Sequence, residues 1–327
     1  MNGGEFPIDA VVTWIDGDDP AHRAKRESYM HGREMRHDDV GGETRYRQMG
    51  EVAFCIASIM RFAPFVRRIF IVTDNQNPNL DRFLEENFPD RRIPVETVDH
   101  KVIFKGWEQY LPLFNSRAIE TMLWRIPGLS EHYIYLNDDF MFTSPASATD
   151  FFDTDGRPVC YADRMAAWKV DLLLRLTPRR NGHKHYGFKN SLLNGARAAG
   201  MRKFFLYLGH APLALRRSVF EEYYGAHPEL IERNIRHRFR NEEQYNPQSM
   251  FYSLMYMRGE CRVVPLRGLA VCMKPNGSDS YFRRKIEAAC RPGVKFFCVN
   301  SLDKATDEQK ALYRRRMMEL LGVRETE

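Results

Sequence analysis

Four short segments rich in β-branched or aromatic residues, spread over the first 140 residues, most constrain what this chain can fold into. They cover residues 8–14, 69–74, 95–99 and 133–136. Each has the length and composition of a buried strand and ends in turn-forming or acidic residues. Between the first two, apolar residues at helical spacing predict a helix over 52–60. Because strands that alternate with helices form a mostly parallel sheet, the expected fold class is α/β.

Acidic residues stand at or just after the ends of three of these predicted strands. They are Asp16 after the first strand, Asp74 after the second, and the pair Asp138 and Asp139 after the fourth. In open parallel sheets, ligands bind beyond the carboxyl ends of the strands, where a packed core needs no carboxylate. Two adjacent carboxylates can bind a hard divalent cation, which can in turn hold a diphosphate. The same pair can instead cap a loop, and for Asp16 an Asp-Gly turn is the simpler interpretation.

The second half of the chain is less regular. Residues 177–190 form a basic, turn-rich stretch. Ser218 with Glu221, and Thr306 with Gln309, have the spacing of capping boxes, which predicts that a helix begins at each place. Since the sequence shows no internal repeat and no low-complexity linker, we expect one domain with a helical, irregular C-terminal half.

Charge and apolar content exclude several classes of protein. Lys and Arg outnumber Asp and Glu by 49 to 43 and are scattered, so we expect no nucleic-acid partner. Aromatic residues make up 13%, which excludes a disordered chain. No run of about 18 apolar residues occurs, and the first residues do not resemble a signal peptide. We therefore expect a cytoplasmic protein; Arg314–Arg316 could bring it to the inner face of the membrane, although a solvated helix face is the simpler interpretation.

The cysteines and two histidines give no metal-binding pattern in the sequence. The six cysteines are far apart and include no CxxC pair, so zinc-binding spacing is absent. We expect reduced thiols that serve mostly as small buried side chains. His183 and His185 flank Lys184 in the basic stretch, where solvated surface histidines are a simpler interpretation than a metal site.

Two further segments contain residue types suited to phosphate chemistry. His210 lies in a predicted turn beside Gly and Pro, where an imidazole can act as a general base or only as a hydrogen-bonded turn residue. Arg236, Arg238 and Arg240 alternate along the chain, and a guanidinium fork fits phosphate oxygens. For Arg236 a solvated surface position is the simpler interpretation. The sequence contains neither a P-loop nor GxGxxG, so we expect no nucleotide site of those kinds.

Taken in order, these segments resemble the Stealth family of sugar-phosphate transferases. That family includes bacterial capsular polysaccharide phosphotransferases and the catalytic subunit of the lysosomal-enzyme N-acetylglucosamine-1-phosphotransferase. The similar blocks are residues 8–19, parts of 47–139 that end in YIYLNDD, residues 210–212 with 240–244, and residues 295–300. Any one block is weak evidence, but four in the family's order cover nearly the whole chain.

The resemblance implies a GT-A-like α/β fold, a mostly parallel sheet flanked by helices. It implies a single catalytic domain over residues 1–327, with a nucleotide-sugar half at 1–150 and an acceptor and phosphate half at 151–327. The implied reaction moves a hexose-1-phosphate, with N-acetylhexosamine as the expected sugar, from a UDP-sugar to a hydroxyl of a polysaccharide or oligosaccharide. The products are a phosphodiester and UMP, in capsule or exopolysaccharide synthesis. The implied cofactor is a divalent cation, Mg²⁺ or Mn²⁺.

The resemblance also implies roles for particular residues. Asp138 and Asp139 would hold the metal ion, and His210 or Asp139 would be the general base. Arg240 would balance charge on the transferred phosphate, and Asp16 would complete the catalytic set. The substrate-binding positions that it implies are Thr13, Trp14, Asp74, Gln76, Asn115, Ser116, Asn137, Gln244 and Asn300.

This chain departs from the family pattern at three positions. Ala53 and Ala57 stand where the second block usually has arginine, and Ser301 stands where the last block usually has aspartate. At the first two positions, alanine cannot make the contacts of an arginine, and the three changes together indicate a divergent subgroup. The membrane anchors and inserted modules of the lysosomal enzyme are absent, which indicates a bacterial type.

Two other functions remain open at this point. An ordinary glycosyltransferase on the same fold would use the same acidic pair but release UDP. A non-catalytic polysaccharide-binding protein would need neither a base at His210 nor a phosphate contact at Arg240.

Overall fold

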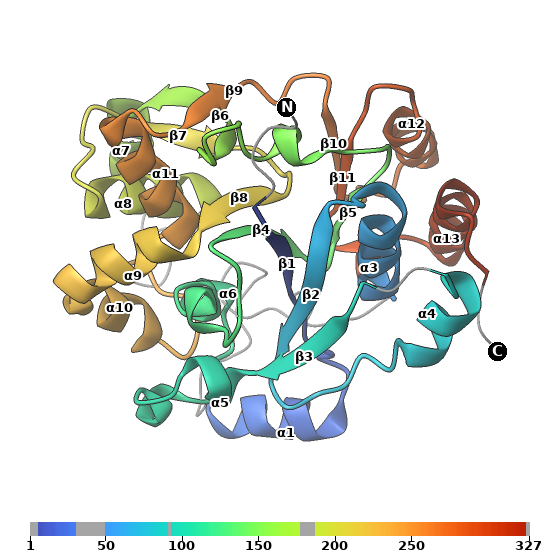
Figure 1. The fold of residues 1–327 in the computed structure, drawn as a ribbon, viewed down its shortest axis with the longest axis horizontal. Helices are drawn as coiled ribbons and strands as arrows, with labels where there is room; N and C mark the ends of the chain where they lie inside the picture. The colour runs from blue at the N-terminus through green and yellow to red at the C-terminus, as the bar shows by residue number, and fades with distance from the viewer. Residues whose placement is uncertain (1–5, 31–49, 91–92, 177–186, 325–327) are drawn as a thin grey trace.

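The central element of the computed structural model is a five-stranded sheet with the strand order β3-β2-β1-β4-β8 (Figure 1). The structure describes residues 6–30, 50–90, 93–176 and 187–324. The strands of this sheet are β1 (Ile8–Thr13), β2 (Val66–Thr73), β3 (Val95–Asp99), β4 (His132–Asn137) and β8 (Leu213–Arg216). The first four are parallel, and β8 pairs antiparallel with β4 at the edge. The carboxyl ends of β1, β2, β3 and β4 therefore lie at one edge.

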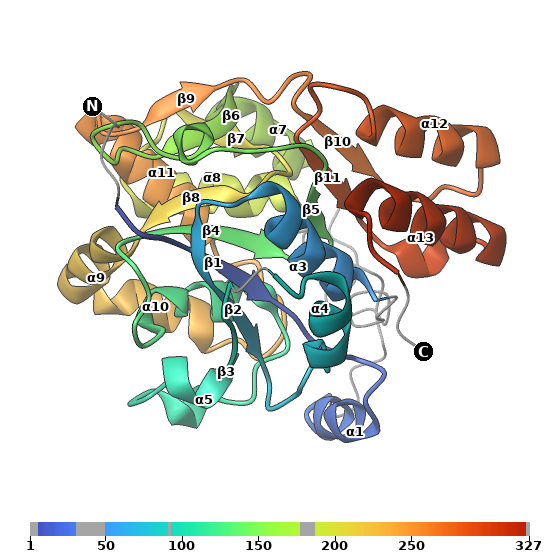
Figure 2. The ribbon, with the colours of Figure 1, turned by 45° about the vertical axis from the view of Figure 1, so that its right-hand side comes forward.

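Apolar side chains cover both faces of this sheet, as expected for parallel strands. On one face, Val12, Ile71 and Leu136 pack against α3 (Glu51–Phe62). On the other face, Val11, Val72 and Tyr135 belong to a cluster that extends into the helices of the second half. Alternate side chains of each strand thus pack into two different apolar clusters, one on each face of the sheet. Helices lie on both sides of the sheet (Figures 1 and 2).

The remaining helices flank the sheet or form the second half. In the first half they are α1 (Pro20–Ser28), α4 (Asp81–Asn87), α5 (His100–Ile103) and α6 (Ser116–Glu120), with 3₁₀ turns at Glu108–Tyr110, Leu123–Arg125 and Ala148–Asp150. In the second half they are α7 (Ala167–Leu176), α8 (Phe188–Ala198), α9 (Arg217–Ala226), α10 (Pro228–Ile235), α11 (Pro247–Arg258), α12 (Asp279–Ala289) and α13 (Asp307–Leu321), with a 3₁₀ turn at Leu302–Lys304. Among the described residues, no helix has the length and apolar character needed to cross a membrane.

Two small sheets stand beside the central one. The first has the order β10-β11-β5 and comprises β10 (Ala270–Met273), β11 (Phe296–Val299) and β5 (Phe140–Phe142). It packs with α12, α13 and one side of α3 in a third apolar cluster. The second has the order β7-β6-β9 and comprises β7 (Phe204–Leu208), β6 (Val159–Ala166) and β9 (Arg262–Val264).

The structure confirms the predicted strands, the helix over 52–60 and the α/β class. It also confirms the capping box of Thr306 and Gln309 at the start of α13. The capping box predicted for Ser218 is wrong, because Ser218 lies inside the first turn of α9, where Glu131 accepts hydrogen bonds from its backbone N–H and its hydroxyl.

Two other expectations about the elements need correction. The helical spacing of Ile119, Met122 and Leu123 predicts a helix that continues to the break at Pro127, but α6 ends at Glu120, where the Thr121 hydroxyl donates to the Arg117 carbonyl. The small sheets of the second half were not predicted. The histidines at 183 and 185, and most of the basic stretch, lie outside the described residues.

A buried carboxylate joins β1 to β2 and to the start of β4. Asp9 is fully buried, and Arg67 donates two hydrogen bonds to it, at 2.9 and 2.8 Å. The Ser130 backbone N–H donates a third at 2.7 Å. A buried carboxylate that loses its cationic partner is strongly destabilising, because its charge remains in a poorly solvated site.

We predict that Arg67→Ala lowers the free energy of unfolding by about 3 kcal/mol, since it leaves the buried Asp9 carboxylate without its cation. The neighbouring Arg68 pairs with a partly exposed Glu96, so Arg68→Ala is a matched control that should cost less than about 1 kcal/mol. Urea denaturation followed by circular dichroism measures both. Equal losses in the two variants would contradict this role for Asp9.

Candidate active site

The carboxyl ends of β1 and β4 are joined by a small hydrogen-bond network. Thr13 and Asn137 are register partners on these two strands. The Asn137 side-chain oxygen accepts hydrogen bonds from the Tyr135 hydroxyl at 2.7 Å and the Thr13 hydroxyl at 3.3 Å. These contacts fix the end of β4 directly before Asp138 and Asp139. Of the three residues, Thr13 and Asn137 were predicted from the sequence and Tyr135 was not.

Asp138 and Asp139 form the turn between β4 and β5. The Val299 N–H donates to the Asp139 carbonyl at 3.1 Å, which ties this turn to the end of β11. The Asp139 side chain is partly exposed, yet its Oδ1 is buried and receives no hydrogen bond from the described residues. Burial, with Asp138 and Glu51 nearby, raises the pKa of the Asp139 carboxyl well above its usual range. A buried carboxylate oxygen without a donor is suited to a bound cation.

His210 lies close to two cysteines beside this turn. Cys272 and Cys298 are direct register partners on β10 and β11, and Phe140 of β5 pairs with Cys298 on its other side. One ring nitrogen of His210 and the two sulfur atoms lie within 4.8 Å of one another. The Cys298 thiol donates to Asp139 Oδ2 at 3.7 Å, which links the group to the acidic turn.

Neighbouring groups orient His210 and alter the thiols. The imidazole stacks on Phe188 with 5.6 Å between ring centroids, and Phe140 meets it edge-on at 6.1 Å. A hydrogen bond from Cys298 and the charge of His210 lower the pKa of the Cys272 thiol to about 6. Asn300 directs its side-chain amide at the Cys298 sulfur at 3.3 Å. Cys272 therefore differs from the apolar buried thiols that the sequence led us to expect.

A second group of predicted residues holds the loop that contains Arg240. The buried Gln244 donates to the Asn115 side-chain oxygen at 3.1 Å, and Asn115 donates to the His237 carbonyl at 2.7 Å. Ser116 accepts a hydrogen bond from the Arg240 guanidinium at 3.3 Å. Asn115 and Gln244 thus position the loop against α6, and the Arg240 side chain comes from that loop.

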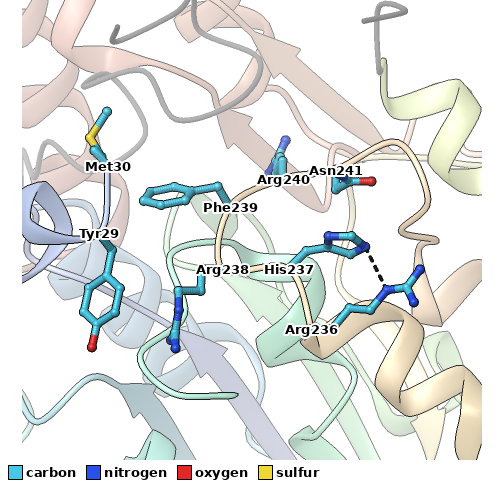
Figure 3. A pocket seen from close by; sticks show the side chains of 8 residues that line it. All are labelled: Tyr29, Met30, Arg236, His237, Arg238, Phe239, Arg240 and Asn241. Atoms are coloured by element: carbon cyan, nitrogen blue, oxygen red, sulfur yellow. Dashed lines mark hydrogen bonds between the residues drawn. The ribbon is translucent and has the colours of Figure 1, made fainter. Parts of the chain in front are cut away.

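The Arg240 loop borders a pocket of about 460 Å³. Its lining residues are Tyr29, Met30, Arg236, His237, Arg238, Phe239, Arg240 and Asn241 (Figure 3). Arg236 pairs with Glu243 at the surface, as predicted. Arg238 donates to two backbone carbonyls and lies 4.5 Å from the Tyr29 ring centroid. Figure 3 shows the side chains of Arg238 and Arg240 leaving the loop on opposite sides.

The predicted residues after β1 and β2 bond within the loop that follows β1 and to α1. Gln76 bonds to both the N–H and the carbonyl of Asp16, at 2.9 and 2.8 Å, and to Asp19 at 3.0 Å. The Asp16 carboxylate accepts from the Asp18 N–H, which is the turn role that the sequence allowed. Asp74 pairs with Lys25 of α1 at 2.8 Å. These contacts fix the loop that follows β1, and Trp14 is buried beneath it.

The three departures from the family pattern have local consequences. Ala57 is fully buried in the apolar cluster between α3 and α13, where an arginine side chain would displace its neighbours. Ala53 is partly buried against the cluster below the sheet. Ser301 adopts φ of 59°, a left-handed conformation that aspartate tolerates better than serine.

Two family models match this chain. Stealth protein CR1, conserved region 1, matches residues 6–34, and Stealth protein CR2, conserved region 2, matches residues 45–160. These ranges contain the first two blocks of the predicted resemblance. The third and fourth blocks remain predictions.

Curated relatives agree with these family matches, and one solved structure shares the fold. The chain is 31% identical over 299 residues to "Exopolysaccharide phosphotransferase cps2G" of Lactiplantibacillus plantarum, covering 81% of this chain and 84% of that protein. It is 36% identical over 261 residues to "Exopolysaccharide phosphotransferase SCO6023" of Streptomyces coelicolor, covering 80% of this chain but 41% of that longer protein. The apo structure of the WbbM bifunctional glycosyltransferase superposes with a TM-score of 0.52 at 10% identity, over 97% of this chain and 50% of that one. The fold is therefore GT-A-like, as predicted.

The buried His100, the first residue of α5, should make the stability of the protein depend on pH. Burial lowers the pKa of His100 from 6.5 to about 4. Between these two values the unfolded chain binds a proton at His100 that the folded chain does not. The contribution of His100 to the free energy of unfolding is therefore fully present above pH 6.5 and is lost as the pH drops toward 4. We expect His100→Gln to remove about 2 kcal/mol of the loss in unfolding free energy between pH 7 and pH 5. Urea titrations at both pH values measure this.

His227, on the surface, provides the control, and His227→Gln should leave the loss unchanged. An equal loss in wild type and His100→Gln would show that His100 does not carry this effect.

Proposed function

This chain belongs to the Stealth family, and we propose that it transfers a sugar-1-phosphate from a UDP-sugar to a hydroxyl of a glycan, releasing UMP. The expected sugar is an N-acetylhexosamine, and the expected product is a capsular or exopolysaccharide phosphodiester. The names of the relatives support phosphotransfer, while the fold alone is equally compatible with glycosyl transfer. The observation that carries the proposal is the meeting of an acidic turn, a histidine and a cysteine pair at the end of β4.

The acidic turn is suited to a divalent cation. Asp139 Oδ1 is buried without a hydrogen-bond donor, and Asp138 stands beside it in the same turn. Oxygen ligands of this kind suit Mg²⁺ or Mn²⁺. When bound, the cation would neutralise the diphosphate of the donor and the charge on departing UMP.

His210 is the proposed general base. Its ring is held by Phe188 and Phe140, next to the acidic turn. In the reaction, a ring nitrogen takes the proton of the acceptor hydroxyl as that oxygen attacks the β-phosphorus. The new bond joins the acceptor oxygen to phosphorus, and the bond from this phosphorus to the oxygen bridging the two phosphates breaks, so UMP leaves. Asp139 is the alternative base if the cation binds elsewhere.

Arg240 is the proposed contact to the transferred phosphate. Loose phosphoryl-transfer transition states spread charge over the equatorial oxygens, and a fixed guanidinium stabilises that charge. Ser116 orients the guanidinium, while Asn115 and Gln244 hold its loop.

The remaining residues have supporting roles in this proposal. We assign Thr13 and Asn137 to fixing the end of β4, and Asp16, Gln76 and Asp74 to fixing the loop that would border the nucleotide. Trp14 and Asn300 complete the predicted substrate-binding set, Trp14 beneath that loop and Asn300 beside the thiols.

We predict that His210→Ala and Asp139→Ala each lower kcat by at least about 100-fold without unfolding the protein, because one removes the proton acceptor and the other a metal ligand. The assay incubates the enzyme with a panel of UDP-sugars, glycan acceptors and Mg²⁺ or Mn²⁺ and measures released nucleotide by chromatography. Acceptor-dependent UMP is the expected product. Arg236→Ala, at the surface, is the control with intact activity.

UDP as the released nucleotide would instead identify a glycosyltransferase. Near wild-type turnover in either variant, with an unchanged circular dichroism spectrum, would remove that residue from the mechanism.

Arg240→Lys should lower kcat by at least about 10-fold although the charge is kept, since the forked contact to phosphate is lost. The control is Arg236→Lys, which makes the same substitution at another arginine of the loop. Steady-state kinetics of the two variants distinguish loss of a phosphate contact at Arg240 from a general effect of replacing arginine with lysine. Equal kinetics for the two variants would make Arg240 a surface charge.

A further inference from the structure

We propose that Zn²⁺, or a cation of similar softness, binds between His210, Cys272 and Cys298 and thereby inhibits the enzyme. Binding would occupy one ring nitrogen of His210 and hold the imidazole in the metal site. The inhibition rests on the proposed function, whereas the binding site rests on geometry alone.

The three ligand atoms are already gathered by backbone structure. The parallel pairing of β10 with β11 sets Cys272 directly beside Cys298, and the loop before β8 brings His210 to them. Their ligand atoms lie within 4.8 Å of one another. Tetrahedral zinc with Zn–S of about 2.3 Å and Zn–N of about 2.0 Å places its ligand atoms roughly 3.4 to 3.8 Å apart. Side-chain rotations that shift the ligand atoms by about 1 Å therefore suffice to bring them to these distances.

A fourth ligand is available without moving the main chain. Asp139 Oδ2 lies 3.7 Å from the Cys298 sulfur, and Oδ1 of the same carboxylate is buried without a donor. Histidine, two cysteines and a carboxylate form a donor set that zinc accepts and magnesium does not favour.

Asn300 would support a bound metal ion by contacting its cysteine ligands without binding the ion itself. Its amide donates toward both sulfurs, at 3.3 Å to Cys298 and 3.9 Å to Cys272. Such N–H···S contacts favour the thiolate form that a metal requires and orient the ligands. A simple disulfide between the cysteines would need neither the histidine nor the carboxylate, so the complete set points to a cation.

The site overlaps the proposed magnesium site at Asp139. A hard cation favours the carboxylate oxygens of Asp138 and Asp139. A soft cation favours the nitrogen and sulfur atoms of the neighbouring histidine and cysteines. A soft cation that binds the imidazole would keep His210 from accepting a proton. It would also bind the Asp139 carboxylate as its fourth ligand. Occupancy of one arrangement therefore opposes the other.

The test uses Co²⁺ as a spectroscopic probe of the reduced chain, residues 1–327. Tetrahedral thiolate ligation gives a near-ultraviolet sulfur-to-cobalt charge-transfer band and intense visible d–d bands, and Zn²⁺ should displace both. Cys272→Ser should abolish the charge-transfer band or weaken Co²⁺ binding by at least about 100-fold, more than the loss of an outer contact costs. Cys290→Ser, a partly exposed cysteine outside the cluster, is the matched control and should bind like wild type.

Activity measurements complete the test. In excess Mg²⁺, added Zn²⁺ should inhibit the wild type and the Cys290 variant, and a zinc-selective chelator should restore them. When each rate is expressed relative to the same variant without Zn²⁺, Cys272→Ser should resist inhibition. Absence of the charge-transfer band in the wild type, or a Cys272→Ser variant that binds Co²⁺ as tightly as the wild type and with the same band, would overturn the site. Equal Zn²⁺ inhibition of both variants would overturn the inhibitory mechanism. Because the spectra need no turnover, they remain decisive if the proposed transfer reaction fails.

Discussion

The turn between β4 and β5 is the constraint on which the rest of the site depends. β4 is fixed in the parallel sheet by β1, and its last side chain is held by Thr13 and Tyr135. Directly after it, the backbone carbonyl of Asp139 is bonded to Val299 at the end of β11. The turn is thus anchored in two different sheets. Moving either sheet would displace the acidic pair, and with it the cysteines and histidine that face Asp139.

Much of the first half could be predicted from local sequence. Strands such as 133–136 are short, apolar and β-branched or aromatic, and the rule that parallel strands present their carboxyl ends together indicated the acidic turn. The second half could not be read in this way. Cys272, Cys298 and His210 meet only because β10 pairs with β11 and β11 with β5, and no local spacing encodes those registers. Ser218 failed for a related reason, since its partner Glu131 comes from a distant loop.

The predicted polar residues fall into two physical groups. Gln76 hydrogen-bonds to the Asp16 backbone and the Asp19 carboxylate. Asn115 and Gln244 bond to each other and to backbone carbonyls, so all three residues fix the loops around the sheet edge. Asp139 and His210 instead retain atoms that protein donors do not saturate or that lie beside other potential ligands. Sequence resemblance groups both kinds together, and only the structure separates residues that position from residues that can react. Around Asp139, oxygen atoms suited to hard cations lie beside nitrogen and sulfur atoms suited to soft cations.

Phosphoryl transfer and glycosyl transfer from a UDP-sugar differ in which bond of the donor breaks. A donor labelled with ³²P at its β-phosphate therefore tests the central claim most directly, in a reaction with glycan acceptor and Mg²⁺ separated by size. The account predicts that the label moves to the glycan in a form resistant to phosphatase, while unlabelled UMP is released. Label that remains in UDP, with unlabelled sugar on the glycan, would contradict it.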